Sequence, residues 1–158
     1  MNQPVRVRLA EPSDANQLMA LINSAFRIAE DFFYNEDRIT FEEVERLFST
    51  GTFLVAEADR LLRGCVYVEL RGDRSYLGLL SVDPSQQQAG LGSLLLDEGE
   101  KYCRELGSRS MDILIINLRT ELPPFYQRRG YVETGTIPLP EDIRTTQPCH
   151  FITMAKPL

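Results

Sequence analysis

The chain alternates between short runs that change polarity at every second residue and longer runs whose apolar positions recur every three or four residues. Short runs of strand type occupy residues 5–9, 52–57, 62–70, 76–82, 111–116, 131–136 and 151–155. Longer runs of helix type occupy residues 12–26, 40–48 and 91–106, and a short helix begins at residue 122. The unbroken apolar run at 111–116 favours a strand that is buried on both faces. The predicted order of elements is therefore β-α-α-β-β-β-α-β-α-β-β.

The connections between these elements predict how the strands pair. Polar turns around Asp59 and Arg60 and at residues 71–74 join three consecutive strands, which favours antiparallel hairpins. The helices between other strands act as crossover connections. We therefore expect an α/β protein whose mixed, mostly antiparallel central sheet is flanked by helices. Because no repeat or linker-like stretch interrupts the sequence, we expect one domain over residues 1–158.

Composition and charge narrow the class of protein. The 158 residues are 43% hydrophobic and 25% charged, which is ordinary for a globular protein. The net charge of −6 argues against a nucleic-acid partner, whose surface requires a basic patch. We expect no membrane span and no secretion signal, because no apolar run is long enough and the N-terminus lacks the signal pattern. Cys65, Cys103 and Cys149 are widely spaced and odd in number, which favours a reducing, cytoplasmic location.

The stretch from Val82 to Ser93 bears the clearest chemistry in the chain. A strand pattern leads into it, and a helix pattern leads out. Backbone N–H groups at a helix N-terminus have no intrahelical partner, and the helix dipole adds positive potential there, so a phosphate group is a suitable ligand. A Walker loop is excluded because no lysine follows the glycines, and a Rossmann fingerprint is excluded because Leu95 stands where the third glycine belongs.

Four segments together resemble the GCN5-related N-acetyltransferase (GNAT) superfamily. Gln87, Gly90 and Gly92 fit its Gln/Arg-x-x-Gly-x-Gly/Ala turn, although the commonest members have arginine and glycine at residues 87 and 88. Leu80-Ser81-Val82-Asp83-Pro84 precedes that turn as it does in the family. Residues 125–131 read Phe-Tyr-Gln-Arg-Arg-Gly-Tyr, like the family's F-Y-x-x-x-G-F, and residues 150–156 resemble its last strand. The order of elements fits the acyl-CoA N-acyltransferase (GNAT) fold over nearly the whole length.

The resemblance implies direct transfer of the acetyl group of acetyl-CoA to a primary amine in a ternary complex, without a metal. A backbone N–H near Leu80 would hold the thioester carbonyl and stabilise the oxyanion. Tyr126 matches the family's usual general acid, which protonates the leaving thiolate; an ordinary helix aromatic, with water as the acid, stays open as the alternative. The implied residues for acetyl-CoA are Leu80, Ser81, Val82, Gln87, Gln88, Ala89, Gly90, Leu91, Gly92 and Ser93.

The acceptor site is less well marked. In the family, the loop between the first two helices shapes it, so Glu30 would bind a cationic amine while Phe33 and Tyr34 wall the pocket. A capping acid followed by core aromatics is an equally good interpretation. Glu69 is a second candidate: it could bind the ammonium group or act as a base through water. The simpler interpretation is that Glu69 is a solvated strand residue. Either Asn117 or Arg119 would contact CoA, and Arg119 could instead pair with Glu121 or with a carboxylate of the substrate.

Two other functions compete with catalysis. A non-catalytic domain that binds or senses acyl-CoA fits the absence of an obvious base, and a nucleotide-binding α/β domain is a remote third possibility. The acceptor, a small-molecule amine or a protein amine, cannot be named from the residues. The family often forms homodimers, but the sequence itself gives no sign of an interface.

Overall fold

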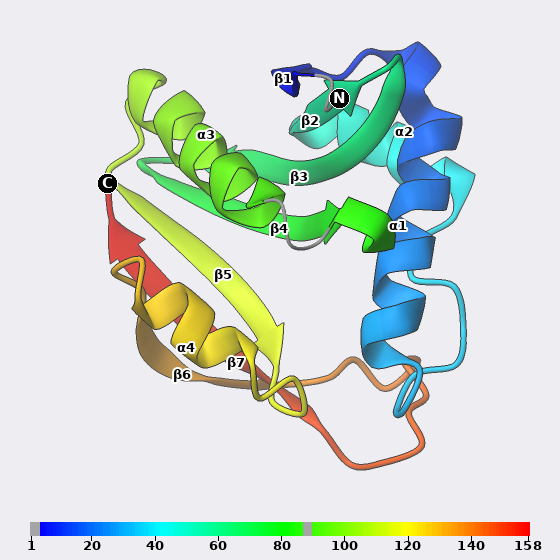
Figure 1. Ribbon diagram of the computed structural model, residues 1–158. Coiled ribbons are helices and arrows are strands. Elements are labelled where there is room, and N and C mark those ends of the chain that lie inside the picture. Colours follow the sequence, from blue (N-terminus) through cyan, green and yellow to red (C-terminus); the bar gives the residue numbers. More distant parts are fainter. Residues whose placement is uncertain (1–3, 87–89) are drawn as a thin grey trace.

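The computed structural model describes residues 4–86 and 90–158, which fold around one seven-stranded sheet (Figure 1). The order of its elements is the predicted one, apart from two added 3-10 turns at Pro12–Asp14 and Pro84–Gln86. The strands are β1 (Arg6–Leu9), β2 (Thr52–Ala58), β3 (Leu61–Arg71), β4 (Arg74–Val82), β5 (Ser110–Ile116), β6 (Val132–Pro138) and β7 (His150–Pro157). The helices are α1 (Ala15–Glu30), α2 (Phe41–Thr50), α3 (Leu91–Glu105) and α4 (Leu122–Gln127).

The sheet is mixed and mostly antiparallel, as predicted. Its strand order is β1-β2-β3-β4-β5-β7-β6, and every neighbouring pair is antiparallel except β4 and β5. The turns at 59–60 and 72–73 close the two predicted hairpins. Helix α3 makes the crossover that brings β5 alongside β4 in the parallel sense.

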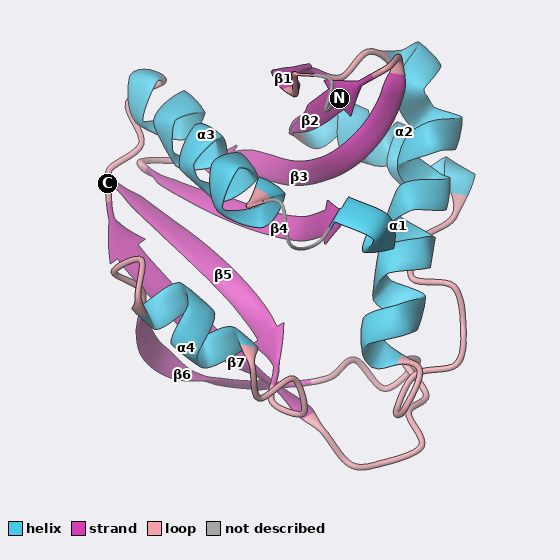
Figure 2. Ribbon diagram, viewed as in Figure 1, coloured by secondary structure: helices cyan, strands magenta, loops and turns pink. Residues whose placement is uncertain are grey.

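Helices cover both faces of the sheet (Figure 2). Alternating side chains of β3 supply the two cores, because successive residues of a strand point to opposite faces. Val66 and Val68 pack with residues of α3 and α4, whereas Cys65 and Tyr67 pack with residues of α1 and α2. The alternation predicted for this strand is therefore confirmed. Among the described residues, no helix combines the length and the apolar character that crossing a membrane requires.

The inward face of α3 differs from the prediction at its end. The apolar periodicity of residues 91–106 predicts that Leu91, Leu95 and Leu106 face inward. Leu91 and Leu95 are buried, but Leu106 is 52% exposed, and Glu100 is buried instead. Gly107 has a φ of +96° and ends the helix, so Leu106 lies beyond the last turn that packs on the sheet. The pattern of apolar positions does not predict that Glu100 is buried. Its carboxylate is buried as an ion pair with Lys156, which lies far away in the sequence.

Strands β4 and β5 lie together at one end of the sheet and diverge at the other (Figure 1). Their described pairing covers only Arg74–Tyr76 against Ser110–Asp112, although both strands continue well beyond it. The prediction that β5 is buried on both faces is wrong at Leu114, which is 39% exposed where the strands part. Beyond this point, the described residues of the two central strands form no backbone hydrogen bonds with each other.

Candidate active site

A cavity of about 590 Å³ opens where β4 and β5 diverge. Its walls come from both strands, from the end of α1 and the loop that follows, and from the starts of α3 and α4. The cavity therefore extends from the N-terminus of α3 to the loop between α1 and α2. Among its lining residues, those that matter for the chemistry are Glu30, Tyr34, Arg38, Leu80, Gly90, Gly92, Ser93, Arg119 and Tyr126.

A bulge in β4 produces the divergence. Cys65 of β3 lies opposite Ser81 and Tyr67 lies opposite Gly78, so Leu79 and Leu80 together face the single residue Val66. Leu79 has a φ of +54°, a conformation that residues with a side chain rarely adopt. A bulge bends its strand and increases the local twist, which turns the second half of β4 away from β5. Leu80, Ser81 and Val82 consequently line the cavity, where the sequence placed the cosubstrate.

The N-terminus of α3 forms one end of the cavity. Gly90 caps the helix with a φ of +76°, which glycine adopts without strain. Gly90, Gly92 and Ser93 line the cavity, whereas the Leu91 side chain is buried in the core. The first backbone N–H groups of this helix lack intrahelical acceptors, so this end can bind an anion. Gln87, Gln88 and Ala89, which were predicted to bind the cosubstrate, lie outside the described residues.

An arginine lies at the same helix end. The guanidinium of Arg129 stacks 4.0 Å from the ring centroid of Phe125, donates to the Phe125 carbonyl at 2.9 Å and contacts Ser93 Oγ. Within the described part of the chain, no carboxylate forms an ion pair with it. Positive charge is unfavourable beside the positive end of a helix dipole, so this arrangement favours an anionic ligand. The sequence prediction did not include Arg129.

Tyr126 lies in the wall formed by α4 and is only 6% exposed. Burial is the main cause that raises the pKa of its hydroxyl to about 12, and the nearby Arg119 partly opposes it. The ring contacts Tyr131 edge-on at a centroid distance of 5.5 Å. Tyr131 in turn donates to Glu100 at 2.9 Å, and Lys156 donates to the other oxygen of that carboxylate at 2.7 Å. The phenol therefore stays protonated at neutral pH and rests on a fixed network.

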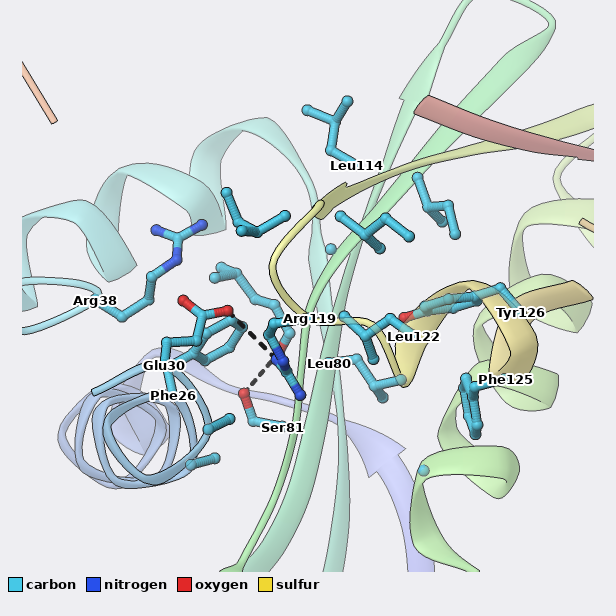
Figure 3. Close-up of a pocket in the computed structure, with 18 of the residues that line it drawn as sticks. Phe26, Glu30, Arg38, Leu80, Ser81, Leu114, Arg119, Leu122, Phe125 and Tyr126 are labelled. Atoms are coloured by element: carbon cyan, nitrogen blue, oxygen red, sulfur yellow. Dashed lines mark hydrogen bonds and ion pairs between the residues drawn. The ribbon is translucent and has the colours of Figure 1, made fainter. Parts of the chain in front are cut away.

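The opposite end of the cavity contains a buried ion pair (Figure 3). Glu30, the last residue of α1, is 6% exposed, and its Oε2 accepts from Arg119 Nη1 at 3.3 Å. Arg119 Nη2 also reaches Glu121 Oε2 at 3.4 Å, while its Nε is buried and has no hydrogen-bond partner among the described residues. Burial raises the pKa of Glu30, and the positive charges of Arg119 and Arg38 oppose that rise. Arg38 stacks over Phe26 at 5.4 Å from its ring centroid.

The structure brings some predicted acceptor residues to this cavity and leaves others away from it. Glu30 and Tyr34 line it. Phe33 is 1% exposed but lies against Phe32 rather than in the described wall, so it matches the interpretation of a core aromatic. Glu69 is also absent from the described wall, because its carboxylate accepts from Tyr67 and pairs with Arg71.

Asn117 and Arg119, the two candidates for a CoA contact, have different surroundings. The side-chain oxygen of Asn117 accepts from the backbone N–H of His150, and the backbone N–H of Asn117 donates to the His150 carbonyl, so Asn117 joins the end of β5 to the start of β7. Arg119 is the one of the two that lines the cavity. Its pairing with Glu30 spans 89 residues of sequence, which no local pattern could have revealed.

Comparisons with known proteins agree with this geometry. Residues 29–148 match the family model described as the acetyltransferase (GNAT) domain. A mycothiol acetyltransferase of Propionibacterium freudenreichii is 28% identical in an alignment of 140 positions that covers 78% of this chain and 41% of that protein. The uncharacterized protein YxbD of Bacillus subtilis is 32% identical over 53 residues, or 34% of this chain and 33% of that protein. The matched part of this chain therefore covers less than half the length of each of these curated relatives.

Solved structures show the same fold. The PaiA N-acetyltransferase of Thermoplasma acidophilum, in complex with coenzyme A, superposes with a TM-score of 0.80 at 20% identity, covering 98% of this chain and 99% of that one. The ribosomal-protein-alanine N-acetyltransferase of Brucella melitensis superposes with a TM-score of 0.79 at 21% identity, covering 97% and 99%. At these identities the likeness concerns the arrangement of elements.

Proposed function

Because the chain belongs to the GNAT acetyltransferase family, we propose that it transfers the acetyl group of acetyl-CoA to a primary amine, with both substrates bound at once. The observation that best supports this is the cavity between β4 and β5, which joins an anion-binding helix end to a buried carboxylate. One substrate can enter from each end and meet the other beside Leu80 and Tyr126. The proposal concerns this chain alone, since the mycothiol acetyltransferase that it resembles is longer.

The described residues fit the parts of acetyl-CoA in order. The amides that begin α3 would hold the diphosphate, helped by Gly90, whose left-handed conformation leaves open space beside its Cα. The edge of β4 from Leu80 to Val82, which has no described partner on the β5 side, would pair with the extended pantetheine arm as an added strand does. The Leu80 N–H would hold the thioester carbonyl and stabilise the oxyanion.

Tyr126 would supply the proton that the leaving thiolate needs. Tyr126 lines the cavity, and its hydroxyl, with a pKa raised to about 12, holds its proton at neutral pH. At the other end of the cavity, the carboxylate of Glu30 would bind the ammonium group of the acceptor, and Tyr34 would form part of the wall. A cationic acceptor suits this carboxylate because burial strengthens the attraction between unlike charges.

Two measurements test the proposal with the wild-type chain. Calorimetry with acetyl-CoA should show saturable binding, and thiol release should follow when acetyl-CoA is mixed with a panel of amines, amino acids and peptide N-termini. Binding without thiol release for any amine would support a non-catalytic acyl-CoA sensor instead. If acetyl-CoA does not bind at all, the proposed site is wrong.

A further inference from the structure

Transfer from acetyl-CoA requires a group that removes a proton from the acceptor. A primary amine resembling the lysine side chain has a pKa of about 10.4, so nearly all of it is ammonium at neutral pH. Only the neutral amine has a lone pair with which to attack the thioester carbonyl. The position and surroundings of the carboxylates in the structure narrow the choice of proton acceptor.

Two carboxylates belong to the described wall of the cavity, and they differ in exposure. The side chain of Glu121 is 63% exposed, whereas that of Glu30 is 9% exposed. Other candidates lie elsewhere. Glu69 is bound to Tyr67 and Arg71, and Asp112 pairs with Arg74 where β4 and β5 are still joined. Glu30 is therefore the buried carboxylate that the described cavity offers.

The two oxygens of Glu30 have different surroundings. Oε2 accepts from Arg119, which fixes the orientation of the carboxylate. Oε1 accepts no hydrogen bond from any described residue, and it is not among the described polar atoms sealed from solvent without a partner. Figure 3 shows one oxygen joined to Arg119 and the other pointing away from it, toward the side on which Arg38 lies. One oxygen is thus held in place, and the other is free to accept a proton.

Glu30 also lies across the cavity from the proposed acid. In the view of Figure 3, Leu80 lies between Glu30 and Tyr126. A proton acceptor and a proton donor on opposite sides of the reacting carbonyl suit a reaction that takes a proton from nitrogen and gives one to sulfur. Burial, which favours the neutral form of Glu30, would bring its proton affinity closer to that of the amine.

We infer that Glu30 is a catalytic residue that takes a proton from the acceptor's ammonium group, an inference that rests on the proposed acetyl transfer. The ammonium group gives one proton to Glu30 Oε1, and the neutral nitrogen forms a bond to the thioester carbon. As the carbon–sulfur bond breaks, Tyr126 protonates the thiolate and recovers a proton from the new amide nitrogen. Glu30 then releases its proton to water, so each turnover yields an amide, a free thiol and one proton.

The charged and titratable groups around Glu30 will modify its titration. Those facing it or lining the same end of the cavity are Arg119 and Glu121 before α4, Tyr34 and Arg38 after α1, and Tyr76 on β4. Arg119 and Arg38 favour the ionised carboxylate, and Glu121 disfavours it. Arg119 is the nearest of these charges, so its removal should raise the pH at which Glu30 becomes able to accept a proton.

The test is the pH profile of kcat/KM for Glu30→Gln, with Asp31→Asn as the control. Asp31 is the next residue, is exposed and is absent from the described wall, so its substitution makes the same change in charge outside the cavity. We expect Glu30→Gln to lower kcat/KM about 100-fold or more at pH 7. The deficit should shrink tenfold per pH unit as the free amine becomes abundant, whereas Asp31→Asn should retain the wild-type profile.

A second variant leaves Glu30 in place. In Arg119→Gln, the acidic limb of the profile should move to higher pH, because the cation that favours the ionised carboxylate is gone. A deficit in Glu30→Gln that is the same at every pH, or an acidic limb that does not move in Arg119→Gln, would overturn the inference while acetyl transfer stands. If the wild type acetylates no amine, the proposed function fails and the inference fails with it.

Discussion

At the scale of single residues, the two ends of the cavity are suited to ligands of opposite charge. The α3 end presents backbone N–H groups, with Arg129 behind its lining residues Ser93 and Phe125, and the α1 end presents Glu30 held by Arg119. The reacting groups would meet between them, against a wall that includes Leu80 and Tyr126. Two residue-scale predictions follow from this separation of charge, one for the proposed acid and one for the arginine.

A variant that lacks only the Tyr126 hydroxyl tests the proposed role of Tyr126 as an acid without changing how its ring packs. Tyr126→Phe keeps the ring contacts with Phe125 and Tyr131 and removes only the proton donor. We expect kcat to fall about 100- to 1,000-fold, while calorimetry gives an unchanged Kd for acetyl-CoA. Wild-type turnover at every accessible pH would mean that water protonates the thiolate.

Arg129, which forms no ion pair with any residue that the structure describes, predicts an effect on binding of the cosubstrate. Arg129→Gln should weaken CoA binding about 5- to 20-fold at low salt, because a charge-assisted contact near the diphosphate is lost. The neighbouring Arg128 is exposed and serves as the matched control, so Arg128→Gln should bind CoA nearly as the wild type does. Equal affinities for the two variants, compared by calorimetry over a range of salt concentrations, would argue that Arg129 only ties α4 to α3.

At the scale of elements, the two ends of α3 share a backbone feature but differ in surroundings. Gly90 and Gly107 both have positive φ, and a side chain at either would meet open space. Gly90→Ala and Gly107→Ala should therefore each destabilise the fold by about 1 kcal/mol through backbone strain. Only Gly90→Ala should also weaken CoA binding, since only Gly90 lines the cavity. Thermal melts and calorimetry on both variants test the pair.

The elements themselves were largely predictable from the sequence, whereas the irregularity that makes the site was not. Periodicity gave the order of strands and helices, and the alternation in β3 gave the correct faces, because burial on each face repeats regularly. The bulge at Leu79 and Leu80 is one extra residue in an apolar strand, and nothing in the residue types marks it. Contacts such as Glu30 with Arg119 depend on elements far apart in the chain, so they follow only from the fold.

At the scale of the whole molecule, the edge of the sheet far from the cavity is stabilised by charge. Arg8 of β1 donates to Asp14 before α1 and to Glu57 of β2, at distances of 2.9 to 3.1 Å. Asp14 also accepts from the Glu11 N–H at 2.7 Å. This network joins the first strand to the sheet and to the first helix, so it should contribute to stability rather than to catalysis.

The pH dependence of stability tests that network. The hydrogen bond from Arg8 is the main cause that holds the pKa of Asp14 below its usual value. A lowered pKa means that the stabilising contribution is present above about pH 4, the usual Asp pKa, and is lost as the pH falls through the folded-state value. We expect Asp14→Asn to lower the free energy of unfolding by about 1–3 kcal/mol at pH 7.

The deficit of Asp14→Asn should diminish as the pH is lowered below about 4, because the wild-type carboxylate then becomes neutral as well. Denaturant titrations of both proteins across this range provide the measurement. A deficit that stays constant down to the lowest pH would show that Asp14 acts through its shape and not its charge. Acetyl-CoA affinity at neutral pH should be unaffected, because the network lies away from the described wall.

The extra residue in β4 has a consequence for how this protein could change by insertion or deletion. Without Leu79, the strand would regain an even pleat, and the residues after Tyr76 could continue their ladder onto β5. In the shortened protein, β4 and β5 would stay hydrogen-bonded to each other, and the space between them would no longer admit a thioester. Deletion of a single codon in this strand could therefore leave the fold intact and its sheet more regular. The same deletion would remove the site of the proposed reaction.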